Sequence, residues 1–332
     1  MQEETKKEHT ATEKQPEKKK VNLDIRPYLA IGLTVILIVV VCIAIFFVVL
    51  RFDGLFSGFQ KILHNPACTV ALVTNAPPQE PYRSQLTNAG IEIWDFPFTS
   101  YRVPADTNWA LAYYKLCAME WVLANKDFAN AAMLDLDTYT QHPLDDLWRE
   151  CGEAVLMYQV PHAASQGMTA AIGKAYDAVE PQGAPHVLTH FGGELVAGSK
   201  ARLADFMALC RQYFNQLQTI GLTPREGDEA IWCGAAYRSL LAGQPVRAAN
   251  AYLFRYWLGG RFYFVSTNYT LDPVCILHLP GAAKDRQLAV LYRRYAKKGS
   301  FPPLEKVHRL CCLPAAHPPL LRTLWVRLLA RL

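Results

Sequence analysis

The chain has 332 residues, of which 51% are hydrophobic and 19% are charged, and its formal net charge at pH 7 is +5. This is about twice the usual length of one domain, so one large domain with attached segments or two smaller domains are expected. The hydrophobic excess is concentrated in one stretch, which argues against a disordered protein and against a transporter with many spans.

That stretch is 28–50, YLAIGLTVILIVVVCIAIFFVVL, 23 residues without a charge. About 20 residues of helix cross the hydrocarbon of a bilayer, so we predict one transmembrane helix. A cleaved signal peptide is the alternative, but the preceding segment 1–27 and the apolar run are both too long, and no cleavage site of small residues follows Leu50. The polar segment 1–27 lacks the apolar residues needed to fold, so we expect a disordered tail.

Charges beside the span predict its orientation. Five Lys and Arg residues stand from Lys14 to Arg26, whereas only Arg51 and Lys61 follow the span within a similar distance. Because Lys and Arg stay on the cytosolic side during insertion, we expect the amino-terminal tail in the cytosol and the residues after Leu50 on the other side.

Charge also divides the residues after the span. Residues 51–283 contain 16 Lys and Arg against 21 Asp and Glu, whereas residues 284–332 contain 11 against 2, a net charge of +9. A basic end on an anchored protein favours contact with anionic lipid or an anionic ligand, and a solvated basic face is the alternative. The segment 320–332, LLRTLWVRLLARL, has helical spacing and could lie at the membrane interface or dock on the domain. Nucleic acid is disfavoured as a partner, because the anchor would hold the domain away from it.

Apolar patterns after a short stem at 51–66 predict an α/β domain at 67–284, followed by a basic tail at 285–332. Short β-branched or alternating runs predict strands at 68–74, 91–96, 130–136 and 274–279. Helical spacing predicts helices at 108–123, with Asn108 as N-cap, and at 199–218 and 228–241. The order strand, strand, helix, strand indicates a largely parallel sheet with helices on its faces.

Two carboxylates, Asp135 and Asp137, stand one residue apart at the end of the apolar run 130–136. Ligands of open α/β sheets bind beyond the carboxyl ends of strands, so this pair could hold a metal ion and phosphates. Carboxylate oxygens suit Mg²⁺ or Mn²⁺. An isolated Asp-x-Asp is weak evidence, because such pairs also occur in turns and helix caps.

A second motif, HLPGAAK, runs from His278 to Lys284 at the end of the last predicted strand. An imidazole at a strand end can be a third metal ligand, Gly281 would let the backbone approach a phosphate, and Lys284 could neutralise the phosphate charge. The alternative is a capping His beside a solvated Lys.

Together, the two motifs resemble glycosyltransferase family 8 and the glycogenin-like enzymes. Further landmarks occur in the same order: Lys115-Leu116 is similar to the family's Lys-Leu helix, 190–196 (HFGGELV) to its Asn-x-Gly segment, and 227–231 (GDEAI) to its Gly-Asp-Gln segment. The resemblance covers about two thirds of the chain. The chain departs from the family at Phe191, where Asn is usual, and at Asp285-Arg286, where Pro-Trp is usual.

This resemblance implies the GT-A fold, a Rossmann-like mixed sheet flanked by helices. It implies a metal-dependent hexosyltransferase that uses Mn²⁺ (or Mg²⁺) and a nucleotide-diphosphate sugar, and that retains the anomeric configuration. The acceptor would be a glycan, a lipid or a protein. Such an enzyme fits a single-pass protein facing the Golgi lumen if the source is eukaryotic, or an inner-membrane protein with its domain in the cytosol if the source is bacterial.

The resemblance also implies roles for individual residues. Asp135, Asp137 and His278 would bind the cation, and Asp228 would bind sugar hydroxyls near the reacting carbon as the catalytic residue. The residues expected to contact the nucleotide sugar are Thr74 and Asn75 at the base or ribose, Gly281 and Lys284 at the diphosphate, and Lys115 at the phosphates or the sugar.

Two other functions stay open. A non-catalytic domain of the same fold, tethered to bind a glycan or to scaffold enzymes, is favoured by the departures at Phe191 and Asp285-Arg286. A metal-dependent phosphohydrolase would need further carboxylate or His ligands near the acidic pair, and none is obvious in the sequence.

Glu194 could be an acid of the acceptor site or the buried partner of a nearby His. The tryptophans are expected to pack at helix or strand positions: Trp109, Trp121, Trp148 and Trp232.

Overall fold

The computed structural model describes Asn65 and residues 67–182, 184–185, 187, 189–255, 273–279, 290–291, 293–294 and 302–310. Several predictions lie outside these residues: the tail 1–27, the span 28–50, nearly all of the stem, Gly281, Lys284 and the segment 320–332. Within the described residues, none of the helices has both the length and the hydrophobicity needed to cross a bilayer.

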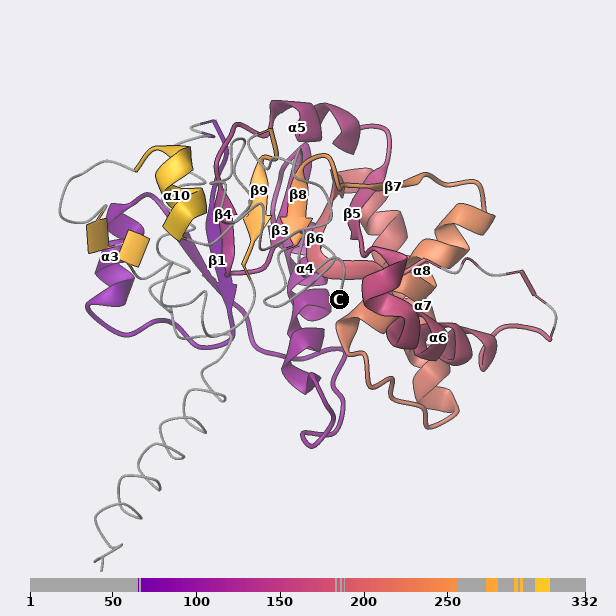
Figure 1. Ribbon diagram of the computed structural model, residues 1–332. Coiled ribbons are helices and arrows are strands. Elements are labelled where there is room, and N and C mark those ends of the chain that lie inside the picture. Colours follow the sequence, from indigo (N-terminus) through magenta and orange to yellow (C-terminus); the bar gives the residue numbers. More distant parts are fainter. Residues whose placement is uncertain are drawn as a thin grey trace, which may run out of the picture. The chain divides into compact units, whose positions relative to one another are not determined.

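The largest sheet has four strands in the order β3-β6-β5-β7 (Figure 1). Its strands are β3 (Asn130–Leu134), β5 (Val155–Gln159), β6 (Phe191–Ser199) and β7 (Val246–Ala248). The long strand β6 runs antiparallel to both β3 and β5, whereas β5 and β7 are parallel. The sheet is therefore mixed, as the resemblance implies, because β6 enters between β3 and β5 in the opposite direction. The largely parallel sheet indicated by the order of elements is not observed.

Two smaller sheets complete the described strands. β1 (Ala71–Thr74) is parallel to β2 (Glu92–Asp95), and α3 (Tyr82–Asn88) connects them. The other sheet has the order β4-β9-β8, formed by β4 (Thr138–Thr140), β9 (Ile276–His278) and β8 (Leu253–Arg255). β9 is antiparallel to β4 and parallel to β8. The predicted strands correspond to β1, β2, β3 and β9, each shorter than expected.

Side chains of the four-stranded sheet alternate between two hydrophobic cores. On β5, Val155 and Met157 enter one core, and Leu156 and Tyr158 enter the other. The first core is shared with α4 (Tyr114–Asn125), α6 (His162–Asp177), α7 (Lys200–Thr219) and α8 (Asp228–Leu241), and the second with α5 (Asp145–Cys151). Because both faces are covered, these strands are apolar at almost every position and lack the polar alternation of a half-exposed strand.

The helices predicted at 199–218 and 228–241 are confirmed as α7 and α8. α7 buries side chains at the spacing of one helical face, including Leu203, Cys210 and Leu217. α8 is buried around nearly its whole circumference. Gly234 allows α7 to approach α8 closely, because a Cβ at this position would lie 2.2 Å from the ring of Tyr213. The short helix α10 (Leu304–Leu310) is the last described element.

The helix predicted at 108–123 begins later than expected. A 3₁₀ turn, η1 (Ala110–Tyr113), precedes α4, and Asn108 does not cap either element. Its side-chain amide donates instead to the carbonyl oxygen of Arg225 (3.3 Å). Trp109 adopts the left-handed conformation, with φ of 60°, and is 63% exposed. The expectation that Trp109 packs is therefore wrong, whereas Trp232 is fully buried.

Candidate active site

Asp135 stands where the β3–β6 ladder ends. Leu134 is the last paired residue of β3, and the backbone N–H of Asp135 still donates to the carbonyl oxygen of Glu194 on β6 (3.1 Å). The hydroxyl of Thr138 donates to the carbonyl oxygen of Asp135 (2.8 Å), which holds the turn between β3 and β4. The two carboxylates of this turn are about a quarter exposed, 28% for Asp135 and 27% for Asp137, so solvent ions can reach them.

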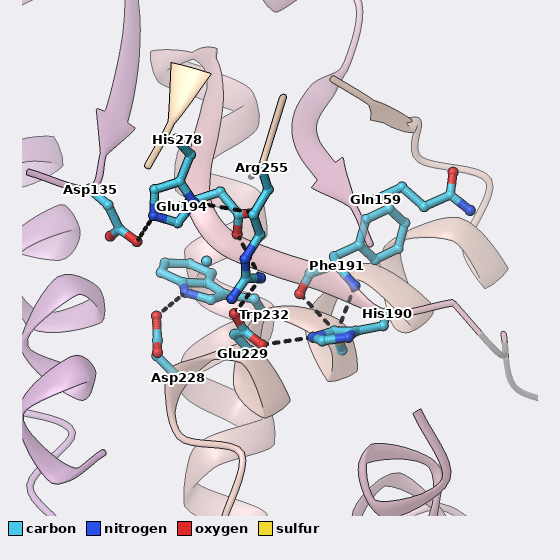
Figure 2. Close-up of polar contacts among 12 residues, drawn as sticks. Asp135, Gln159, His190, Phe191, Glu194, Asp228, Glu229, Trp232, Arg255 and His278 are labelled. Atoms are coloured by element: carbon cyan, nitrogen blue, oxygen red, sulfur yellow. Dashed lines mark hydrogen bonds and ion pairs between the residues drawn. The ribbon is translucent and has the colours of Figure 1, made fainter. Parts of the chain in front are cut away.

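Pairing between β4 and β9 brings His278 to this turn. Thr138 is opposite His278, and the N–H of Leu279 donates to the carbonyl oxygen of Asp137 (2.9 Å). Nε2 of His278 consequently lies 3.0 Å from Oδ1 of Asp137, a residue 141 positions away in the sequence, and 3.7 Å from Oδ2 of Asp135. Figure 2 shows the imidazole directed at Asp135.

These three side chains fit a divalent cation. One potential ligand atom from each of Asp135, Asp137 and His278 lies within 4.8 Å of the other two. Two carboxylates and one imidazole form the mixed oxygen and nitrogen set that Mn²⁺ accepts, and solvent would supply the remaining ligands. When bound, the cation would supply positive charge for an anionic ligand.

Lys115 and Asp228 adjoin the acidic pair from two helices. Nζ of Lys115, in the first turn of α4, lies 3.2 Å from Oδ1 of Asp135 and 2.8 Å from Oδ2 of Asp228, at the start of α8. Nζ also donates to the carbonyl oxygen of Gly193 (3.1 Å), and Nε1 of Trp232 donates to Oδ2 of Asp228 (3.0 Å). A Cβ at Gly193 would lie 2.6 Å from Asp228, so the glycine makes room for this ion pair.

The pKa values of these groups follow from burial and from neighbouring charge. Burial favours the neutral form of Lys115, but Asp135 and Asp228 outweigh this effect and raise the pKa of Lys115 above its usual value. Burial raises the pKa of Asp228, and Lys115 only partly offsets this effect. Burial also opposes the charged forms of His278 and Asp137, but their mutual attraction raises the pKa of His278 to about 10 and lowers that of Asp137.

A second layer of charged residues lies behind His278 (Figure 2). Glu194 is 1% exposed and faces both His278 and Arg255. Arg255 also pairs with Glu229 (3.2 Å), and Glu229 lies 2.7 Å from Nε2 of His190. Glu194 is therefore a buried carboxylate that faces a His, as one of its two expected roles states.

The two residues expected to contact the base or ribose, Thr74 and Asn75, lie at the end of β1 and differ in their exposure. Thr74 is fully buried, and its hydroxyl donates to the carbonyl oxygen of Ala76 (2.8 Å) while it accepts from the N–H of Ala76 (3.2 Å). Asn75 is exposed at the end of β1. Phe191, at the departure from the family pattern, is buried in the core beside Cys233. Contact of Thr74 and Asn75 with a nucleotide stays a prediction.

Sequence reasoning missed the contributions of Arg255, Glu229 and His190. Arg255 follows the apolar pair Leu253-Phe254, and Glu229 stands beside Asp228 in the first turn of a helix, where acids are common. A buried Arg in an apolar run is the one signal that could have indicated a charged partner, because buried charges are paired.

Comparison with known proteins assigns no family to this chain. No family model matches it, and no curated protein matches it. Among solved structures, the crystal structure of an active-site mutant of LgtC is similar, with 15% identity, a TM-score of 0.48 and coverage of 79% of this chain and 96% of that chain. These values are too low to transfer an activity, so the site is interpreted from its own residues.

Proposed function

We propose that this chain is a metal-dependent glycosyltransferase, which moves a hexose from a nucleotide-diphosphate sugar to a glycan, lipid or protein acceptor with retention of configuration. The observation that carries this proposal is the convergence of Asp135, Asp137 and His278 from the ends of β3 and β9. The order of the motifs, which resembles family 8 of the glycosyltransferases, supports the same reaction.

Each residue of the site has a role in this proposal. Asp135, Asp137 and His278 hold Mn²⁺ or Mg²⁺, which supplies charge for the diphosphate leaving group. Lys115, held charged between Asp135 and Asp228, adds positive charge beside the same phosphates. Asp228 faces the sugar with the oxygen that Lys115 and Trp232 leave unused, and Gly281 and Lys284 contact the diphosphate.

The second candidate function is a binding module, that is, a non-catalytic domain of the same fold that binds a glycan or scaffolds enzymes. It is retained because the family's Asn is replaced by the core residue Phe191. Assays of the purified full-length chain in detergent distinguish the glycosyltransferase from the binding module. We expect Mn²⁺-dependent binding of at least one nucleotide sugar in a screen, and slow donor hydrolysis or transfer when Mn²⁺ is present. A chain that binds a glycan but neither a nucleotide diphosphate nor Mn²⁺ would be the binding module.

Substitution identifies the site in this screen. Asp137→Ala removes one ligand and should abolish donor binding, whereas Asp127→Ala, at a fully exposed acid before β3, should leave it unchanged. Unchanged donor binding in Asp137→Ala would contradict the assignment. Hydrolysis of simple phosphomonoesters without sugar transfer would favour the phosphohydrolase.

We also propose that residues 28–50 anchor the chain with the segment 1–27 in the cytosol, and that the domain faces the Golgi lumen in a eukaryotic source. The charges flanking the span support this orientation. In microsomes from eukaryotic cells, added protease should remove an epitope placed before residue 27 and spare one placed after 284. The reverse result would place the domain in the cytosol, as expected for a bacterial inner-membrane protein.

A further inference from the structure

The sequence Gly192-Gly193-Glu194 builds a buried carboxylate into the middle of the sheet. The Glu194 side chain folds back over Gly192, where a Cβ would lie 2.0 Å from its Oε2. Any residue other than glycine at 192 would therefore displace the carboxylate. At 1% exposure Glu194 does not reach solvent, so its two oxygens depend on neighbouring side chains for their hydrogen bonds.

One oxygen of Glu194 faces Nδ1 of His278, the ring nitrogen that points away from Asp135 and Asp137. Oε1 of Glu194 lies 3.8 Å from Nδ1 of His278, whose Nε2 faces Asp137 and Asp135. This distance exceeds a hydrogen bond, yet both atoms are buried and have no hydrogen-bond partner in the described region. A shift of less than about 1 Å would bring the two atoms within hydrogen-bond distance and would satisfy both.

The other oxygen of Glu194 contacts Arg255, which is the first of a series of ionisable side chains. Nη1 of Arg255 lies 3.4 Å from Oε2 of Glu194 and 3.2 Å from Oε1 of Glu229, and His190 contacts the second oxygen of Glu229 (Figure 2). All four side chains are less than 15% exposed. They come from β6, β8, α8 and the residue before β6, so the elements that form the core also fix the carboxylate.

We infer that Glu194 is the positioning residue for His278: it accepts the Nδ1 proton, leaves Nε2 free to bind the cation, and is itself held in place by Arg255. A metal-binding His ordinarily donates its second ring N–H to a carboxylate or carbonyl, which fixes the tautomer and the ring orientation. Glu194 touches neither cation nor substrate, and it acts only through the imidazole. The inference rests on the proposed metal site.

The test measures Mn²⁺ binding rather than turnover. Titration of the full-length protein with Mn²⁺, followed by the electron paramagnetic resonance signal of the free ion, should give an affinity about 10 to 100-fold lower for Glu194→Gln than for the parent protein. Glu194→Asp keeps the charge but shortens the reach, so its affinity should fall between the two. This variant also carries the test if Glu194→Gln does not fold.

A matched control separates positioning from a general loss of a buried ion pair. Glu180→Gln breaks a mostly buried ion pair with Arg238, in which the Glu180 side chain is 18% exposed, and should leave Mn²⁺ affinity unchanged because Glu180 pairs with none of the candidate cation ligands in the described structure. In the metal-free protein, the ¹⁵N chemical shift of Nδ1 of His278 should report a changed hydrogen bond in Glu194→Gln and no change in Glu180→Gln.

The outcomes are distinguishable. Parent-like Mn²⁺ affinity in folded Glu194→Gln, or an equal loss in Glu180→Gln, would overturn the positioning role while leaving the proposed function intact. A parent protein that binds no Mn²⁺ would overturn both. An altered His278 spectrum together with weaker Mn²⁺ binding is the supporting result.

Discussion

Gly193 is the residue at which three elements meet without a side chain between them. It lies on β6 against Lys115 of α4 and against Asp228 and Trp232 of α8. Because glycine has no Cβ, residue 193 leaves the space that the ion pair between Lys115 and Asp228 occupies.

Gly193→Ala should separate that pair. The added Cβ would lie 2.6 Å from Asp228 and 3.0 Å from Lys115, so the side chains must move, and overpacking of this kind costs about 1–3 kcal/mol of unfolding free energy. Donor binding should fall as well. Gly167→Ala in α6, with nothing within 4 Å of its Cβ, is the control and should be neutral or slightly stabilising. Denaturant titration and a donor-binding assay measure both effects. Parent-like values for Gly193→Ala would contradict the close packing.

Glu229 should make unfolding depend on pH. Burial opposes its ionisation, but His190 and Arg255 lower the pKa of Glu229 from 4.5 to about 2. A carboxyl with a lowered folded pKa contributes stability that is present above its unfolded pKa and is lost as the pH falls through the folded value. The contribution is about 3 kcal/mol above pH 5.

The variant Glu229→Gln measures this contribution. Its unfolding free energy should fall below that of the parent protein at pH 7, and the gap should narrow between pH 5 and pH 2. If the difference in unfolding free energy between the two proteins stays constant from pH 5 to pH 2, His190 and Arg255 do not lower the pKa of Glu229.

At the scale of elements, the turn before α4 is strained where it meets the turn before α8. Trp109 holds a left-handed φ of 60°, and its Cβ lies against Gly227, itself at a φ of 68°. Left-handed backbone costs about 1–2 kcal/mol for a residue with a side chain.

Trp109→Gly should therefore be more stable than Trp109→Ala, by about 1 kcal/mol, because only glycine relieves the strain. Both variants lose the same ring, which is 63% exposed and contributes little to the core. Thermal unfolding of the pair measures the difference, and a more stable alanine variant would rule out backbone strain at this position.

The elements that could be predicted are those whose pattern ends at a clear signal. β2 alternates, β3 is an apolar run that ends at two acids, and α8 has helical spacing, so the sequence predicts each from its own residues. β3, β5 and β6 all have both faces covered and show no polar alternation. The two acids that follow β3 mark its end, whereas β5 and β6 carry no such signal and are not predicted as strands. Their antiparallel pairing is set by the cores and not by local sequence.

At the scale of the whole molecule, the described site carries an excess of negative charge. Five carboxylates face three cationic groups, which are Lys115, Arg255 and His278 with its raised pKa of about 10. The carboxylates belong to Asp135, Asp137, Glu194, Asp228 and Glu229. Confining like charges in a poorly solvated site destabilises the folded chain, and a divalent cation would offset much of this cost.

Mn²⁺ should therefore stabilise the folded protein. At 100 times its dissociation constant, the ion should raise the unfolding free energy by about 2.7 kcal/mol, and a chelator should reverse the effect. Asp137→Ala should abolish the response, and Asp127→Ala should keep it. Thermal unfolding with and without the ion tests this prediction; an equal response in both variants would show that Mn²⁺ binds elsewhere.

The convergence of the three candidate cation ligands could be predicted, but their surroundings could not. Asp135, Asp137 and His278 stand at strand ends in recognisable motifs, so their types and order sufficed. The layer of Glu194, Arg255 and His190 forms only when β6, β8 and β9 come together in space. No local pattern encodes that meeting.

Because β4 pairs with β9, the candidate cation site can form only after β9 has been synthesised. During synthesis, the helices and strands up to Arg255 can already bury most of both cores, yet the imidazole that completes the candidate cation site emerges later. A ribosome-bound or truncated chain that stops before Ile276 would hold two acids and no third ligand. Cation binding at the proposed site would therefore require that synthesis has passed β9.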